Sequence, residues 1–274
     1  MNSFWLFVGC LLAGPIHAGA ASLPPDSTAI RHREFVTTLS YGSNLDYFGR
    51  TQARAFPYFS TAFDYTTKGG LFASAELFNL LHTPDLLDET DLSLGWIGDL
   101  SPSVDASVSY SRFIFASGSE LVKASVNNSL NAHLGQDWGP FYTRLSGNYL
   151  YGGSSGRGDG FLTLENSRYM EIPHVFTPNA FISIEPLVSA SAGTQSFAET
   201  SLTKRYLLGK RTRTTTTSRK FSIVDYELAL PVTYTLGKVS VAAAWRYIIP
   251  VNLPADDQDS HKLSIWTFGI SLTL

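Results

Sequence analysis

Large apolar residues recur at every second position through most of the chain after residue 33. The segment SVDASVSYS (103–111) is typical, because Val104, Ala106, Val108 and Tyr110 alternate with serines and an aspartate. A period of two predicts β-strands with one apolar and one polar face, since successive side chains of a strand point to opposite sides. About twelve strands are predicted, at 34–43, 56–66, 71–77, 89–98, 103–111, 122–126, 141–151, 161–171, 180–194, 224–234, 239–247 and 264–274.

Three of these segments depart from a regular strand pattern. Pro186 and Pro231 lie inside the segments 180–194 and 224–234, where a proline cannot donate a ladder hydrogen bond. We therefore expect bulges or local defects at both prolines. The segment 161–171 alternates poorly and is the least regular of the set.

The connections between the predicted strands sort by length. One side carries the tight links 66–70, 99–103, 136–140 and 235–238, with the longer 172–179 as an exception. The other side carries the links 43–53, 79–90, 152–160, 196–220 and 250–260, with the short 116–120 as an exception. Short turns at one end and long loops at the other, with an even strand number, are typical of a transmembrane barrel. The predicted fold class is all-β, an antiparallel up-and-down transmembrane β-barrel.

The composition of the two strand faces indicates which face meets lipid. The polar face consists mostly of Ser, Thr, Gly, Ala and Asn, which are too small and polar to fill a dry core. In a membrane barrel the apolar face points outward, and aromatic residues gather near the strand ends. The residues predicted for these aromatic girdles are Tyr65, Trp96, Tyr110, Tyr149, Tyr151, Tyr226, Tyr234, Trp245, Tyr247 and Trp266.

Overall composition limits the other possibilities. The 274 residues are 44% hydrophobic and 16% charged, with a formal net charge of −3, which gives no case for nucleic-acid binding. After residue 20 no apolar run approaches the ~20 residues of a membrane-spanning helix.

The first residues carry the features of an export signal. An apolar stretch from Phe4 to Ala13 precedes Ala18-Gly19-Ala20, which fits a small-residue cleavage site, although no Lys or Arg precedes the stretch. We expect a signal peptide at 1–20, a short periplasmic segment at 21–33 and the barrel at 34–274. A short buried helix, or a lipid-modified Cys10, would be the alternatives. If Cys10 leaves with the signal, the mature protein has no cysteine for a disulfide.

The segment SIWTFGISLTL (264–274) carries a resemblance to a known class. Its large apolar residues alternate with small ones up to Leu274. With this ending the chain resembles bacterial outer-membrane β-barrel proteins, and the ending is similar to their C-terminal assembly signal, although such proteins usually finish on an aromatic residue. The resemblance implies residence in the bacterial outer membrane, contact with its lipid, and recognition of residues 264–274 by the barrel-assembly machinery. The stretches 41–52 and 63–79 are more loosely similar to the opening hairpin of uncharacterised barrels, which implies no activity.

The first functional hypothesis is a passive, porin-like channel. Carboxylates outnumber basic groups on the predicted inner face, and such a lining favours cations or neutral polar solutes. The alternative is that these groups pair and fill a closed structural barrel. A plugged transporter is not expected, because few residues precede the first strand. The pore-lining candidates are Asp64, Glu76, Asp105, Lys123, Arg144, Glu185, Asp225, Glu227 and Arg246.

The second hypothesis is an outer-membrane lipid hydrolase, which needs a serine and a histidine close together with an orienting group. His133 is predicted to face the lumen near the short turns, away from the surface lipid. His261 follows Asp259 and Ser260 at the loop end, but adjacent strand residues point to opposite faces. We therefore expect no enzyme and no cofactor. The segment 255–261 lacks the spacing of a calcium loop, so no metal is expected either.

The third hypothesis is a surface-binding barrel. Between Glu199 and Asp225 the charged residues are all basic, while acidic residues predominate elsewhere. We expect this segment to form a hairpin beyond the membrane that contacts lipopolysaccharide phosphates or an anionic ligand; a merely solvated hairpin is the alternative. Its basic residues are Lys204, Arg205, Lys210, Arg211, Arg213, Arg219 and Lys220.

Overall fold

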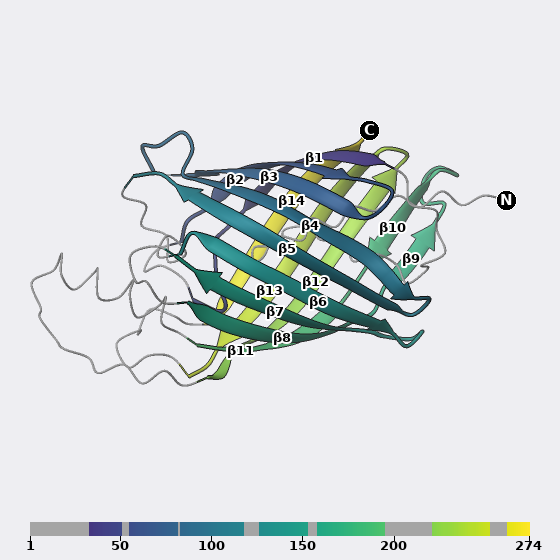
Figure 1. Ribbon diagram of the computed structural model, residues 1–274. Helices are drawn as coiled ribbons and strands as arrows, with labels where there is room; N and C mark the ends of the chain where they lie inside the picture. The colour runs from purple at the N-terminus through teal and green to yellow at the C-terminus, as the bar shows by residue number, and fades with distance from the viewer. Residues whose placement is uncertain are drawn as a thin grey trace, which may run out of the picture.

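The computed structural model describes residues 33–50, 55–81, 83–117, 126–152, 158–194, 221–252 and 262–274, which form a closed β-barrel (Figure 1). Within these ranges no helix is long and apolar enough to cross a membrane. The strands are β1 (Glu34–Gly42), β2 (Tyr58–Thr66), β3 (Leu71–Leu80), β4 (Glu89–Ser101), β5 (Val104–Phe115), β6 (Asn128–Asp137), β7 (Tyr142–Tyr151), β8 (Asp159–Ser167), β9 (Met170–Pro173), β10 (Ala180–Ile184), β11 (Leu187–Gly193), β12 (Ser222–Leu236), β13 (Val239–Pro250) and β14 (Leu263–Thr273).

The strands pair in an antiparallel order that closes on itself. Each strand from β1 to β7 pairs with the next, β8 pairs with β11, β11 pairs with β12, and β12 to β14 continue the series. The last strand, β14, pairs with β1, with Val36 opposite Thr273 and Gly42 opposite Thr267. The result is a barrel of 12 antiparallel strands with two extra short strands. Closure leaves no unpaired edge between the first and last strands.

The two extra strands arise where the eighth and ninth barrel strands are interrupted. Arg168 and Tyr169 separate β8 from β9, and Glu185 and Pro186 separate β10 from β11. Both β10 and β11 pair with β12, so they form one barrel strand with a break at the proline. The expected defect at Pro186 is confirmed. β12 itself runs through Pro231 in register with β13, but its pairings with β10 and β11 skip Leu230 and Pro231, so the local defect expected at Pro231 lies on that side of the strand.

The sixth strand, β6, runs from Asn128 to Asp137 and lies in the second half of the stretch between the predicted links 116–120 and 136–140. Of the alternating segment 122–126 only residue 126 lies within the described ranges, so the rest of that prediction stays a prediction. In Figure 1 the ends of the strands that border the predicted longer links lie at one end of the barrel, and the C-terminus lies at the other. We call these ends the long-loop end and the short-turn end.

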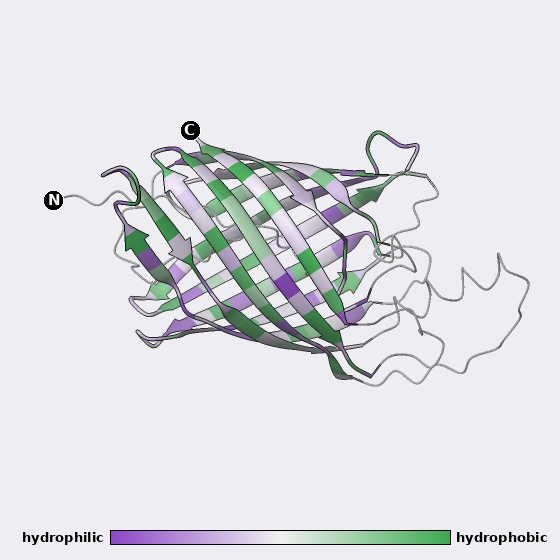
Figure 2. Cartoon of the chain, turned by 180° about the vertical axis from the view of Figure 1, so that it is seen from behind, coloured by the Kyte–Doolittle hydropathy of each residue, from purple (hydrophilic) through white to green (hydrophobic). Residues whose placement is uncertain are grey.

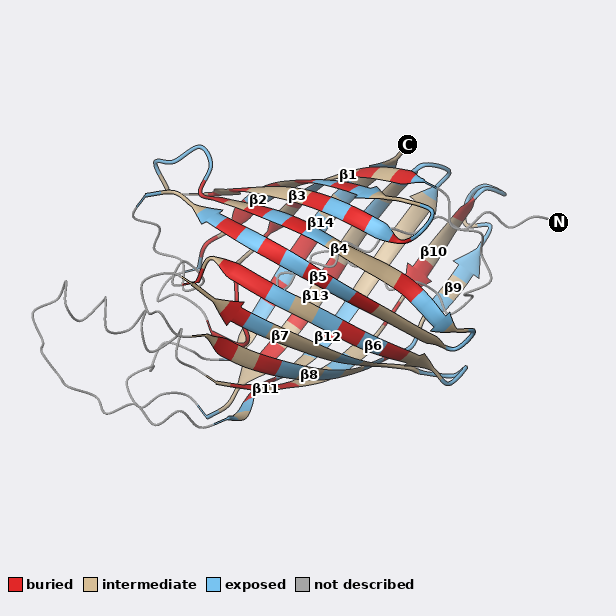
Figure 3. Ribbon diagram, viewed as in Figure 1, coloured by how far each residue is buried: buried red, intermediate tan, exposed pale blue. Residues whose placement is uncertain are grey.

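The outer wall of the barrel is apolar, as the inverted pattern predicts. In β14, Trp266, Phe268, Ile270 and Leu272 are exposed, whereas Thr267 on the other face is 4% exposed. Figure 2 shows apolar bands across the outside of the strands, and Figure 3 shows buried and exposed positions alternating along them. This arrangement suits a lipid exterior and a polar interior.

Several predictions concern residues outside the described ranges and stay predictions. They are the signal peptide, all but the last residue of the periplasmic segment, Lys123, the basic residues at 204–220, the segment 255–261 and His261.

Candidate functional site: the barrel lumen

The pore-lining candidates within the described residues lie on the inward faces of strands. The exception is Glu185, which lies between two strands. Asp64, Asp225 and Arg246 are between 4% and 6% exposed. Glu185 lies at the break between β10 and β11 and is buried as well. The full set that the structure brings into the lumen is Asp64, Glu76, Asp105, Arg144, Glu185, Asp225, Glu227 and Arg246.

The arginines of the lumen pair along the wall with carboxylates on neighbouring strands. Arg144 on β7 contacts Glu165 on β8. Arg246 on β13 donates from Nε and Nη2 to the two carboxylate oxygens of Glu227 on β12, at 2.7 and 2.6 Å. Both pairs are therefore formed along the wall, between neighbouring strands. Neighbouring strands bring the partners within reach, so pairing needs no contact across the lumen.

A third carboxylate joins Arg246 from a loop rather than a strand. Asp46 lies in segment 43–50, which follows β1, and its Oδ1 accepts a bond of 3.0 Å from Nη1 of Arg246. Arg50 of the same segment donates to the backbone carbonyls of Val224 on β12 and of Val251 just after β13. Segment 43–50 thus folds inward at the long-loop end and attaches to β12 and to residues after β13.

Aromatic contacts complete the attachment of segment 43–50. Phe48 stacks on Phe161 of β8, with ring centroids 3.8 Å apart and an interplanar angle of 7°. Tyr47 and Phe48 belong to a buried apolar cluster with Phe113, Val126, Leu150, Phe161 and Val224. These partners come from β5, β7 and β8, from just before β6, and from β12, so the cluster spans the lumen. A second cluster of Leu45, Phe56, Tyr58, Phe78 and Leu80 packs segment 43–50 against β2 and β3.

Backbone geometry lets this segment turn inside the barrel. Phe48 and Gly49 both adopt positive φ, at 47° and 69°. A Cβ on Gly49 would lie 2.8 Å from the Cβ of Asp225, so the glycine also permits close approach to β12. The long-loop end of the lumen is consequently filled by side chains in this structure.

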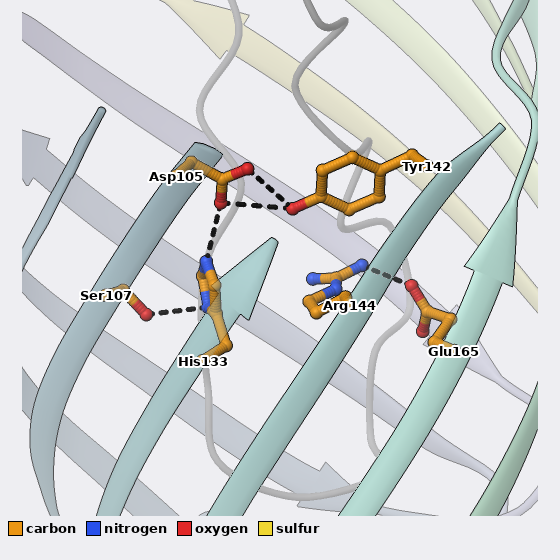
Figure 4. A network of polar contacts seen from close by, with 6 residues as sticks. All are labelled: Asp105, Ser107, His133, Tyr142, Arg144 and Glu165. Atoms are coloured by element: carbon orange, nitrogen blue, oxygen red, sulfur yellow. Dashed lines mark hydrogen bonds and ion pairs between the residues drawn. The ribbon is translucent and has the colours of Figure 1, made fainter. Parts of the chain in front are cut away.

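A polar network occupies the wall nearer the short-turn end (Figure 4). Asp105 and Ser107 lie on β5, and His133 lies opposite Ser107 on β6. Nδ1 of His133 is 2.7 Å from the Ser107 hydroxyl, and Nε2 is 3.0 Å from Asp105 Oδ1. Because an ionised carboxylate only accepts, Nε2 carries the proton, and in the neutral ring Nδ1 accepts from Ser107. This arrangement places a general base beside a hydroxyl.

Tyr142 extends the network from β7 across β6. Its hydroxyl donates to Asp105, with distances of 3.0 and 2.8 Å to the two carboxylate oxygens. The intervening position on β6 is Gly135, where an added Cβ would lie 1.9 Å from the Tyr142 hydroxyl. The glycine is therefore required for the tyrosine to reach Asp105.

A cavity runs along a different wall of the lumen, where the side chains are small. It is lined from β1, β10, β12, β13 and β14 and from residues at the two strand breaks. The inward residues that line it are Thr38, Ser40, Tyr169, Ser183, Glu185, Thr233, Ala242, Ala244, Thr267, Gly269 and Ser271. Small side chains on this wall leave open space in the half of the barrel that segment 43–50 does not fill.

The described lumen is more acidic than the predicted residue set suggests. Residues that the sequence analysis missed include Glu34, Asp46, Arg50, Glu89, Asp91, Asp159 and Glu165. The alternation of inward and outward positions could have identified those of the missed residues that lie on strands. Asp91 shares its face with Ser93, and Glu165 shares its face with Thr163. Asp46 and Arg50 had no such signal, because their position depends on how a loop folds. Within the described ranges no three metal-binding side chains come together as a metal site.

Comparison of the sequence with models of known protein families, and with curated proteins, gives no match. The barrel does match solved structures. The KdgM porin aligns with a TM-score of 0.48 and 7% identity, covering 87% of this chain and 98% of that one. The NanC porin aligns with a TM-score of 0.45 and 10% identity, covering 88% and 100%. An outer membrane channel from Pseudomonas putida F1 gives a TM-score of 0.44 and 9% identity, covering 92% and 100%.

These structures are outer-membrane barrels, and this chain is a closed 12-strand barrel with an apolar outer wall. Because the identities and TM-scores are low, the functions of the matched proteins cannot be transferred to this chain.

Proposed function

We propose that this protein is a channel of the bacterial outer membrane for small polar or cationic solutes. The observation that carries the proposal is the surplus of carboxylates along the lumen, from Asp64 near the short turns to Asp159 near the long loops. Carboxylates in a narrow aqueous passage attract cations and repel anions. The cavity along the small-residue wall supports a passage through the half of the barrel nearer the short turns.

The position of segment 43–50 in the lumen is the reason for proposing a gate at the long-loop end. The segment fills the lumen there, and it is held by the ion pair between Asp46 and Arg246 and by the stacking of Phe48 on Phe161. A solute passes only when these contacts open, because segment 43–50 and its buried apolar partners occupy this part of the described lumen. The closed structural barrel is the competing account, in which the contacts never open.

Planar-bilayer recording of the refolded full chain tests the proposal. We expect discrete current steps, with a cation preference that weakens in the double variant Asp64→Asn/Glu185→Gln. Asp85→Asn is the matched control, because Asp85 is an exposed carboxylate in the connection between β3 and β4. A bilayer that stays silent, also for variants that release segment 43–50, would support the closed structural barrel instead.

One contact favours a second candidate function, hydrolysis of an acyl ester inside the lumen. Such chemistry uses a nucleophile, a base and an orienting carboxylate, and here Ser107, His133 and Asp105 could take these three roles in that order. The same contact also fits a simpler role, since other inward serines bond across strands, for example Ser93 with Ser111 at 2.8 Å. The channel is the better-supported function, because strand backbone N–H groups are engaged in ladder bonds and form no oxyanion site here.

Labelling with a fluorophosphonate probe distinguishes these roles of Ser107. Hydrolytic function requires labelling that is lost in Ser107→Ala and in His133→Gln, while Ser93→Ala stays labelled. Absence of labelling in the folded wild-type barrel rules out the hydrolase.

A further inference from the structure

Arg112 is the one charged side chain on the outward faces of the described strands; Arg168, which is also exposed, lies in the break between β8 and β9. Arg112 of β5 is exposed on the same face as Val108, Tyr110 and Ile114. On the remaining outward positions of β1–β8 and β10–β14 the side chains are apolar, aromatic, small or neutral polar. A charged group on a lipid-facing surface is costly, and a solitary one is therefore a candidate functional residue.

Arg112 lies at the level of the membrane interface on the long-loop side. It stands opposite Asn128, the first residue of β6, and Asn128 stands opposite Tyr151, the last residue of β7. Tyr149 and Tyr151 stack nearby, with ring centroids 5.8 Å apart. Aromatic residues of this kind mark the depth of lipid headgroups. The guanidinium is thus placed among headgroups rather than among acyl chains.

The guanidinium is held in position by a neutral partner. Nη1 of Arg112 donates to Oδ1 of Asn128 at 2.9 Å, and the Tyr110 hydroxyl donates to the same oxygen at 2.7 Å. Asn128 also donates to the Tyr151 carbonyl at 3.2 Å, and it is 9% exposed although its strand position faces outward. The bond to Asn128 uses one of the five N–H donors that a guanidinium carries. Within the part of the chain that the structure describes, no carboxylate forms an ion pair with Arg112.

We propose that Arg112, positioned by Asn128 and Tyr110, binds a phosphate group of an outer-leaflet lipid, namely the lipid A part of lipopolysaccharide. A planar guanidinium fixed along one edge matches the oxygens of a phosphate, and the pairing removes the cost of a lone charge at the lipid surface. The site is separate from the lumen. It rests on the proposed outer-membrane location and is independent of conduction.

Native mass spectrometry of the folded full-length barrel in detergent, titrated with diphosphoryl lipid A, tests this site. We expect Arg112→Gln to weaken binding of the first lipid by about tenfold, as loss of a charge-assisted contact predicts. Arg112→Lys keeps the positive charge but lacks the paired N–H donors of the guanidinium, so it should weaken binding by about threefold. Arg168→Gln is the matched control with no expected change, because Arg168 is exposed between β8 and β9 near the short-turn end.

Two results would overturn the proposal: equal binding of lipid A by wild type and Arg112→Gln, or equal binding of phosphatidylcholine and lipid A by wild type. Heat-modifiable gel mobility first shows that each variant is folded. Inorganic phosphate should compete weakly, and full displacement of lipid A by it would also contradict a lipid site. Because no current is measured, a barrel that binds lipid A but never conducts would refute the channel and leave this site intact.

Discussion

Arg246 connects the inward-folded segment to the barrel wall, because its guanidinium binds one carboxylate from each. Its side chain is 8% exposed, and those of Asp46 and Glu227 are 1% and 14% exposed. Breaking a buried ion pair by removing one partner costs about 3 to 5 kcal/mol, since the other charge stays buried without compensation. If the Arg246 charge is removed, the smallest structural change that avoids this cost is the release of Asp46 into water.

We therefore expect Arg246→Gln to detach segment 43–50 while the barrel stays folded. Arg50 is 2% exposed, so trypsin cleavage after Arg50 should be slow in the wild type and at least tenfold faster in the variant. Mass spectrometry of the tryptic peptides measures this rate, with Arg168→Gln as the control. Equal cleavage rates in wild type and Arg246→Gln would show that the ion pair does not hold the segment.

At the scale of the element, most strands followed from the sequence because their pattern is local. Alternation along β5 or β14 reflects lipid on one side and polar lumen on the other, and it needs no knowledge of partners. The segment 161–171 alternates poorly because it crosses the interruption at Arg168 and Tyr169. Segment 43–50 could not be predicted, because its contacts join residues far apart in sequence, such as Arg50 with Val251.

The proposed gate can be tested by fixing segment 43–50 to β12. A pair of cysteines at Gly49 and Asp225 would need a shift of about 1 Å to reach the usual Cβ–Cβ separation in a disulfide, and the cysteine at position 49 must also adopt the positive φ of Gly49. The chain's one native cysteine, Cys10, precedes the barrel, so Gly49→Cys/Asp225→Cys should form a single bridge. We expect oxidation to abolish current steps and reductant to restore them in the same bilayer. Currents that are the same before and after oxidation would show that the gate lies elsewhere.

The last strand carries a prediction about assembly. Leu274 is 61% exposed on the outward face, and its backbone N–H bonds to the Phe35 carbonyl at 2.9 Å. If residues 264–274 are recognised through their apolar face, Leu274→Asp should lower the folded fraction in cells several-fold, and Leu274→Phe should preserve or raise it. Heat-modifiable mobility of membrane extracts measures that fraction. Unchanged folding of Leu274→Asp would remove the terminal residue from the recognition signal.

For the whole molecule, the barrel has two functional halves. The half near the long loops is filled by segment 43–50 and its apolar clusters, whereas the half near the short turns keeps a cavity beside a charged wall. The sequence predicted an acidic lumen from strand parity, but it did not distinguish these halves, because the filling comes from a loop. We therefore propose a gated passage rather than an open pore.

Cation selectivity is the central claim, and the reversal potential in a salt gradient tests it most directly. With KCl more concentrated on one side of a bilayer containing the refolded protein, carboxylates outnumbering arginines in the passage should favour K⁺ over Cl⁻. The account predicts a reversal potential with the sign of a cation-selective channel. A reversal potential at zero, or with the opposite sign, would contradict it.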